Sequence, residues 1–170
     1  MSSPNEPTWI DARDALILHE RLLALHGGAD GVRDDGLLLS ALARPRQRAA
    51  YDATADVPTL AALYTAGVVG NHPFVDGNKR TGFLLGVLFL ELNGWSFAAH
   101  QEDAANAVIA LVAGEIDEAA YGAFLAANAS ELSPPPSRGG CRRTAAGPGR
   151  ASSGPSAGTS DSRPAGRPAQ

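Results

Sequence analysis

The fold class is decided by the stretch FLLGVLFLEL at residues 83–92, in which only Gly86 and Glu91 interrupt a run of apolar side chains. A helix that is apolar on every face is buried all round, and a run of about ten residues is too short to cross a membrane. Asn93-Gly94 follows and is typical of a helix end. The stretch therefore predicts the central, fully buried helix of an all-α domain.

The sequence on both sides of this stretch is also predicted to be helical, because apolar residues recur between capping and helix-stopping residues. Asp11 and Asp117 are expected to begin helices, whereas Gly27 and Pro45 are expected to end two of them. The stretch 46–57 is polar and is expected to be irregular, and no alternating pattern indicates a strand of useful length. The further helices are expected at residues 12–26, 37–43, 58–68, 102–112 and 117–128.

Residues 133–170 differ sharply in composition from the rest, since they contain seven Pro, seven Gly and six Arg but no aromatic residue, Leu, Ile or Val. Such a segment cannot bury enough apolar surface to offset the entropy of ordering, so it is predicted to be a disordered tail. Its Arg residues and Asp161 sum to +5, which leaves −9 for residues 1–132 of a chain with net charge −4. An acidic domain binds nucleic acid poorly, and nucleic-acid binding by the tail is a weaker interpretation than simple solvation.

Several classes of protein are disfavoured by what the 170 residues lack. A single Cys cannot build a disulfide framework or a thiolate metal site. No stretch reaches the roughly 18–20 apolar residues of a membrane span, and Met1–Thr8 lacks the apolar core of a signal peptide. We therefore expect a cytoplasmic protein without a membrane partner, with a flexible N-terminus at residues 1–7 and one domain at residues 8–132.

The segment HPFVDGNKRTG at residues 72–82 carries the chemistry of the domain. Lys79, which is the only Lys of the chain, and Arg80 fall at the start of a helix, where unpaired N–H groups attract anions. Cations there oppose the helix dipole by about 0.3–1 kcal/mol each, so their placement makes sense if an anion completes the site. Asp76 could hold Mg²⁺ against phosphates, and His72 could accept a proton near neutral pH. The segment predicts a phosphate-transfer site, although it lacks a P-loop.

The neighbours of these residues are expected to play structural roles. Pro73 favours an extended backbone at His72, and Phe74 is expected to pin the loop to the core. The other histidines, His19, His26 and His100, are expected at the surface or at helix ends.

The segment resembles the signature loop of the Fic/Doc family, and more closely its Doc branch, the death-on-curing toxins of type II toxin–antitoxin systems. The adenylylating Fic branch has the form His-Pro-Phe-x-x-Gly-Asn-Gly-Arg-x-x-Arg, whereas Lys79 and Phe83 here replace the second Gly and the last Arg. The stretches GLLLSALARP at 36–45 and LFLELNG at 88–94 are also similar to the family. The resemblance covers about residues 8–130 and implies a helical bundle around a buried central helix, with residues 46–57 as a short flap that holds the target.

The resemblance also implies a role for each residue of the loop. His72 would be the general base, Asp76 would bind Mg²⁺, and backbone amides of the next residues would bind phosphate. Arg80 would clamp the phosphates. The residues that would bind the nucleotide phosphates are Gly77, Asn78, Lys79 and Arg80.

For the function, the resemblance implies a kinase that transfers the γ-phosphate of ATP to a hydroxyl, expected on a Thr, of a translation factor such as elongation factor Tu, which halts translation. The chain contains no inhibitory motif of the form Ser/Thr-x-x-x-Glu-Gly/Asn. Inhibition is therefore expected from a small antitoxin that acts in trans. Two alternatives stay open, namely a Fic-type protein adenylyltransferase and a non-catalytic module that binds protein through a Fic fold.

Overall fold

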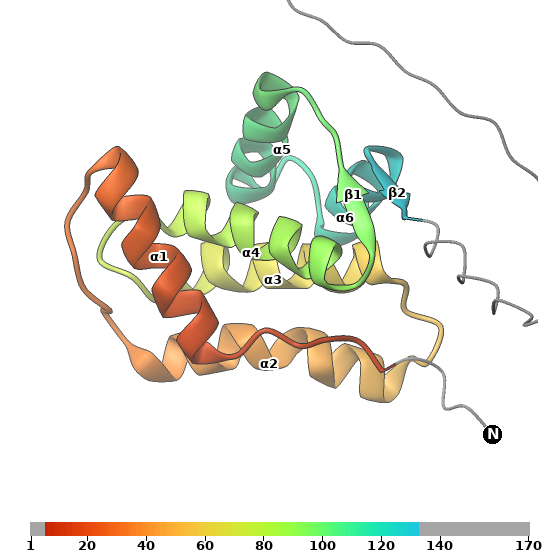
Figure 1. Ribbon diagram of the computed structural model, residues 1–170, viewed down its shortest axis with the longest axis horizontal. Coiled ribbons are helices and arrows are strands. Elements are labelled where there is room, and N and C mark those ends of the chain that lie inside the picture. The colour runs from red at the N-terminus through yellow and green to blue at the C-terminus, as the bar shows by residue number, and fades with distance from the viewer. Residues whose placement is uncertain (1–5, 133–170) are drawn as a thin grey trace, which may run out of the picture. The chain divides into compact units, whose positions relative to one another are not determined.

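The computed structural model describes residues 6–132, so the expectations for residues 1–5 and for the tail at 133–170 lie outside the described residues. The described part is all-α apart from one small sheet, as the sequence predicts (Figure 1). None of its helices is long and apolar enough to span a membrane. The elements are α1 (Ala12–His26), α2 (Asp35–Tyr51), α3 (Val57–Asn71), α4 (Asn78–Leu92), β1 (Trp95–Phe97), α5 (Gln101–Ala113), α6 (Glu118–Ala127) and β2 (Ala129–Glu131).

Helix α3, and not α4, is the most deeply buried helix of the described part, so the prediction for residues 83–92 is wrong in this respect. Ten of the 15 residues of α3 are buried, and α2, α4 and α6 all pack against it (Figure 1). Small residues such as Ala61, Ala62 and Gly67 let these neighbours come close. In α4 one face is buried through Leu85 and Phe89, while the opposite face is partly exposed. The apolar run of α4 is therefore not matched by complete burial.

Helix α2 continues through Pro45 to Tyr51, whereas the sequence predicted that Pro45 would end it. A proline inside a helix leaves the carbonyl of the residue four positions earlier without its N–H donor, and that residue is Ala41. The Ala41 carbonyl oxygen lies 3.0 Å from where a Cβ of Gly67 would be, so it faces the bare backbone of α3. Pro45 is itself buried. Burial of this face and the close approach to Gly67 offset the cost of the proline.

This close contact predicts a large difference between two glycines of α3. Gly67→Ala is expected to lower the free energy of unfolding by about 1–3 kcal/mol, because its Cβ would lie 3.0–3.2 Å from three atoms of Ala41. Gly70→Ala, where a Cβ meets nothing within 4 Å, is the matched control and is expected to raise it by up to about 1 kcal/mol. Urea denaturation of both variants measures the difference. Equal stability of the two variants would contradict a tight α2–α3 contact.

The sheet consists of β1 and β2, which pair antiparallel with Trp95 opposite Glu131 and Phe97 opposite Ala129. Three residues per strand are too few for an alternating sequence pattern, which is why the sequence did not predict them. The pairing brings the end of α6 next to the end of α4 (Figure 1). The pairing therefore connects the chain directly after α4 to the chain directly after α6.

Residues 46–57, which the resemblance implies to be an irregular flap that holds the target, are partly helical and lie away from the candidate site. Residues 46–51 belong to α2, and the short connection that follows lies at the N-terminal end of α3. His72 caps the opposite end of α3, about 20 Å away along the helix axis. The loop between α1 and α2, residues 27–34, lies beside the candidate site instead.

Candidate active site

One pocket of about 390 Å³ is lined by all six residues that the sequence predicted for the site. They come from the loop between α3 and α4, residues 72–77, which we call the site loop, and from the first turn of α4. Val75 is the remaining lining residue. The structure thus brings together His72, Asp76, Gly77, Asn78, Lys79 and Arg80.

His72 ends helix α3 in a left-handed conformation, with φ 50° and ψ 55°. It is the only residue other than glycine with positive φ among residues 6–132, and the expectation of an extended backbone before Pro73 is therefore wrong. Its backbone N–H still donates to the Val68 carbonyl at 3.1 Å. This conformation costs about 1–2 kcal/mol for a residue with a Cβ. It turns the chain sharply out of α3 and leaves the imidazole exposed to the pocket.

The α1–α2 loop, residues 27–34, supports the start of the site loop from one side. Val32 and Phe74 form an isolated antiparallel bridge, and the Val75 N–H donates to the Gly31 carbonyl at 3.0 Å. The Pro73 carbonyl accepts N–H groups of the same loop at 2.7 and 3.2 Å. Phe74 is 1% exposed and anchors the site loop in the core, as predicted.

Asn78 holds the site loop in shape through its side chain. Its Oδ1 accepts the Phe74 N–H at 3.0 Å, and its Nδ2 donates to the Phe74 carbonyl at 2.9 Å. The side chain is buried, so Asn78 can face a ligand only with its backbone N–H. The loop then passes through Gly77 at φ 74°, which a side chain would strain, and α4 begins.

The N-terminus of α4 differs from those of the four helices that Asp side chains cap. Asp11, Asp34, Asp56 and Asp117 each accept a backbone N–H of the first turn of their helix. Helix α4 has no side-chain cap, and its first turn carries cations and no acid. Because first-turn N–H groups point out of a helix, this end can receive an anion between its amides and the side chains of Lys79 and Arg80.

Asp76 is exposed beside this helix end, and two backbone amides hold its carboxylate. The Gly77 N–H donates to Oδ1 at 2.6 Å, and the Ala29 N–H donates to Oδ2 at 3.4 Å. These hydrogen bonds, and to a lesser extent the charge of Arg80, lower the pKa of Asp76, so the carboxylate is ionised at neutral pH. A Cβ at Gly28 would lie 2.8 Å from Oδ2, which shows how closely the α1–α2 loop approaches.

This donor set fits a magnesium ion that also binds phosphate. Mg²⁺ is commonly held by one or two carboxylates together with substrate oxygens, and the Asp76 carboxylate keeps lone pairs beyond its two hydrogen bonds. Within residues 6–132 no group of three His, Cys, Asp or Glu side chains could form a metal site of protein ligands alone. A cation held by Asp76 would therefore take its other ligands from a bound molecule or from water.

His19 lies directly beneath the site loop and was not predicted to do so. It is 2% exposed, its Nδ1 lies at hydrogen-bond distance from Thr81 Oγ1, 3.0 Å, and its ring stacks on Phe74 at 3.8 Å. Burial lowers the pKa of His19, which favours a neutral imidazole. The spacing of Ala15, His19 and Leu22 on one helical face is the sequence signal that indicates this burial.

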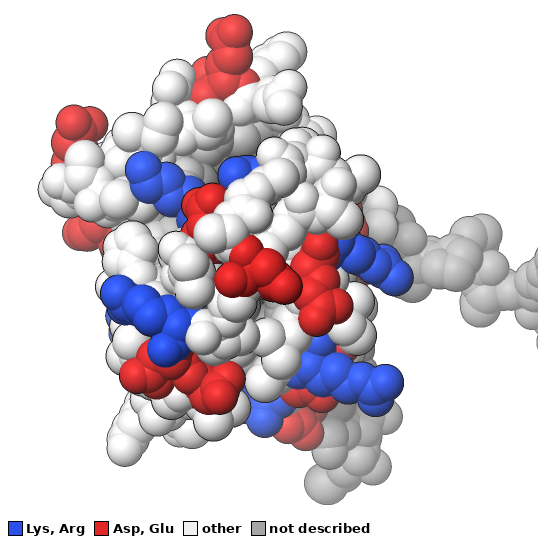
Figure 2. Space-filling view, turned by 90° about the vertical axis from the view of Figure 1, so that its left-hand side faces the viewer, with Lys and Arg blue, Asp and Glu red and all other residues white. Residues whose placement is uncertain are grey.

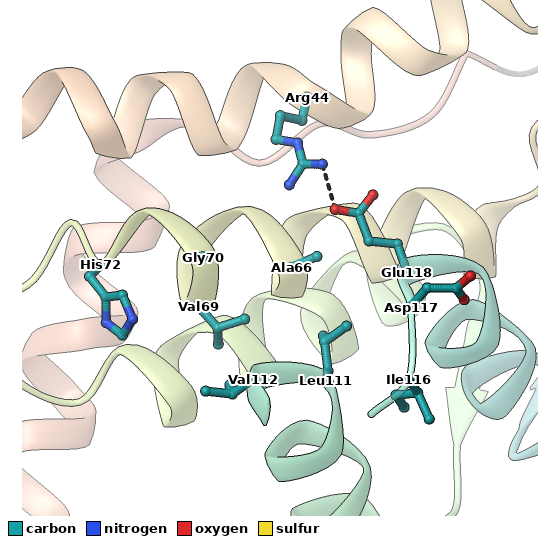
Figure 3. Close-up of a pocket in the computed structure, with 10 residues that line it drawn as sticks. All are labelled: Arg44, Ala66, Val69, Gly70, His72, Leu111, Val112, Ile116, Asp117 and Glu118. Atoms are coloured by element: carbon teal, nitrogen blue, oxygen red, sulfur yellow. Dashed lines mark hydrogen bonds and ion pairs between the residues drawn. The ribbon is translucent and has the colours of Figure 1, made fainter. Parts of the chain in front are cut away.

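Two further pockets adjoin the one that holds the loop residues, and neither was predicted from the sequence. A pocket of about 510 Å³ shares Lys79 and Arg80 with it and is otherwise mostly apolar, with walls from α4, β1 and α5. A pocket of about 450 Å³ shares His72 and extends along α3 (Figure 3). The pocket with Lys79 and Arg80 therefore adjoins a mostly apolar pocket at these two residues and a second pocket at His72.

Basic and acidic side chains intermingle on the face that carries the α1–α2 and α3–α4 loops (Figure 2). Because charges of opposite sign largely cancel at longer range, this face attracts an anion only where individual cationic groups lie close to it. The free helix end with Lys79 and Arg80 is such a local arrangement.

The chain is similar in sequence to proteins of one family. The model of the Fic/DOC family matches residues 9–90, which include the whole site loop. The protein kinase doc of Escherichia phage P1 is 32% identical over 85 residues, or 50% of this chain and 68% of that protein. The toxin Doc of Mycolicibacterium smegmatis is 44% identical over 75 residues, or 43% of this chain and 57% of that protein.

Proposed function

Because this chain belongs to the Fic/DOC family, we propose that it is a Doc-type toxin kinase that phosphorylates a protein hydroxyl. The substrates are ATP with Mg²⁺ and a translation factor, with a Thr of elongation factor Tu as the expected acceptor, so that translation halts in the cytoplasm. A small antitoxin inhibits it in trans. The observation that carries the proposal is the single pocket in which an imidazole, a carboxylate and two cations surround an uncapped helix end.

The chemistry of the proposed reaction follows from this arrangement. His72 accepts the proton of the acceptor hydroxyl while its oxygen forms a bond to the γ-phosphorus. The bond between the γ-phosphorus and the bridging oxygen breaks, and ADP leaves with the electron pair. The amides of α4, Lys79 and Arg80 stabilise the negative charge on the phosphoryl oxygens. When held by Asp76, Mg²⁺ supplies further charge neutralisation.

The apolar pocket next to Lys79 and Arg80 favours transfer of the γ-phosphate. Phe83, Val87 and Phe97 line it, and apolar walls of this kind suit a nucleobase. A nucleoside bound there would run its phosphates past Arg80 and Lys79 toward His72, because these two cations line both pockets. The terminal phosphate would then be the one nearest His72. Phe83, which stands where the adenylylating branch has its last Arg, contributes to the same apolar wall.

Two radioactive labels test the proposed reaction directly. The full-length protein is incubated with purified elongation factor Tu, Mg²⁺ and ATP that carries ³²P at either the γ or the α position. We expect the γ label on the acceptor and no α label. Transfer of the α label alone would replace the kinase proposal with adenylylation, and transfer of neither label would refute this acceptor.

A further inference from the structure

His72 lies at the mouth of a second groove, in addition to the pocket that holds the phosphate-binding residues. This groove of about 450 Å³ runs along the surface of α3 from His72 toward an ion pair between Arg44 of α2 and Glu118 of α6 (Figure 3). The end of α5 forms the opposite wall with Leu111 and Val112 (Figure 3). His72 is the one lining residue that the two cavities share.

The lining of this groove does not suit phosphate. Its floor on α3 is formed by Ala66, Val69 and Gly70, and its far end carries carboxylates. Arg44 is neutralised by its ion pair with Glu118, so the charge of Asp117 is left over at this end. Apolar side chains of α3 and α5 therefore line the middle of the groove, and its end is slightly acidic, whereas the pocket on the other side of His72 carries Lys79 and Arg80.

We propose that this groove, the α3 groove, binds the segment of the protein substrate that carries the acceptor hydroxyl. The inference rests on the proposed function and adds the place and chemistry of the second substrate. An uncharged or basic segment fits the charge of the groove, and the phosphates of a nucleotide do not. From Ala66 to His72 the helix advances about 9 Å, a length that an extended segment spans with about three residues. A hydroxyl at the end of such a segment meets the imidazole from the side opposite the phosphates.

Gly70 offers a way to close the α3 groove without disturbing the fold. It is exposed on the groove floor, and a Cβ added there meets no atom within 4 Å. A larger side chain at this position therefore occupies the groove rather than the core. Ala and Leu also favour a helix more than Gly does. Gly70→Leu should consequently keep the stability of the protein while it obstructs the acceptor.

The test measures phosphorylation of purified elongation factor Tu by full-length Gly70→Leu and Gly70→Ala proteins. The acceptor KM is expected to rise at least tenfold for Gly70→Leu and less for Gly70→Ala, with melting temperatures no lower than that of the unmodified protein. Calorimetric titration with a non-hydrolysable ATP analogue is expected to give affinities within twofold of the unmodified protein. Ala126→Leu, at an exposed position of α6 that lines none of the three pockets, is the matched control and should leave both quantities unchanged.

Each other result counts against the α3 groove as the acceptor site. If the unmodified protein transfers phosphate and Gly70→Leu does so with the same KM, the groove is not used and the proposed function stands. If Gly70→Leu weakens the nucleotide analogue as much as the acceptor, the occupant is the nucleotide. If the unmodified protein transfers neither the γ nor the α label to elongation factor Tu, this acceptor is refuted, and the inference that the groove binds its segment fails with it.

Discussion

His72→Ala is expected to slow phosphate transfer by about 10²–10⁴-fold, the range found when a general base is removed. The imidazole is exposed and lines both the α3 groove and the pocket that holds Lys79 and Arg80. It could therefore meet a hydroxyl bound in the groove and a phosphate bound in the pocket. Since the side chain is exposed, its loss removes little packing. Initial rates with γ-labelled ATP and elongation factor Tu measure the effect. In a bacterial host, the unmodified protein is expected to slow growth and the variant is not.

The left-handed backbone of His72 requires a second variant as a control. Asn tolerates this conformation better than Ala, as His itself does, so His72→Asn preserves the turn and still removes the base. Both variants should be inactive and should keep their melting temperatures within a few degrees of the unmodified protein. If His72→Asn retained most of the transfer rate, His72 would act through the shape of the turn and not as a base. Equal growth inhibition by all three proteins would show that toxicity does not come from catalysis.

Arg80→Ala is expected to reduce transfer by about 10²–10³-fold, the typical cost of removing one group that stabilises transition-state charge. Within residues 6–132 Arg80 takes part in no ion pair, so its guanidinium is available to a phosphate. Arg80→Lys should recover part of the rate only, because an ammonium group cannot bind two phosphate oxygens in the fork geometry of Arg. Initial rates at saturating and subsaturating ATP separate an effect on kcat from an effect on KM.

Stability should change in the opposite direction to activity in this variant. A cation in the first turn of α4 opposes the helix dipole, so Arg80→Ala is expected to raise the free energy of unfolding by about 0.3–1 kcal/mol. Arg13→Ala is the matched control, since Arg13 is also an exposed cation in the first turn of a helix, α1. It should gain similar stability and lose no activity. An Arg80→Ala protein that is both less stable and less active would indicate that Arg80 supports the fold and does not bind phosphate.

The candidate site could be read from the sequence because its residues are close together along the chain. All six predicted lining residues fall between His72 and Arg80, and a loop followed by a helix end brings such neighbours into one pocket. Helix limits could be predicted where a local cap sets them, as at Asp11, Gly27 and Asp117. In these places the free energy that decides the structure comes from hydrogen bonds and backbone preferences within a few residues.

Features that depend on distant contacts were predicted wrongly or missed. Pro45 should stop a helix by local rules, yet its burial and the close approach of Ala41 to Gly67 keep α2 intact. The burial of His19 depends on Phe74 and Thr81, which lie more than fifty residues away along the chain. The place of the α1–α2 loop beside the site follows from backbone hydrogen bonds to residues 73–75, for which side-chain patterns carry no signal.

The sequence by itself therefore determined the helical class, the family resemblance and the set of residues that line the cationic pocket. The tertiary structure decided that α3 is the central helix, and it placed an apolar pocket and the α3 groove on the two sides of the cationic one. The physical reason is that an apolar run shows only that a helix tends to be buried. Which helices pack against it depends on how closely their backbones can approach one another. Small residues in α3 allow the closest approach on the most sides, so the other helices pack around it.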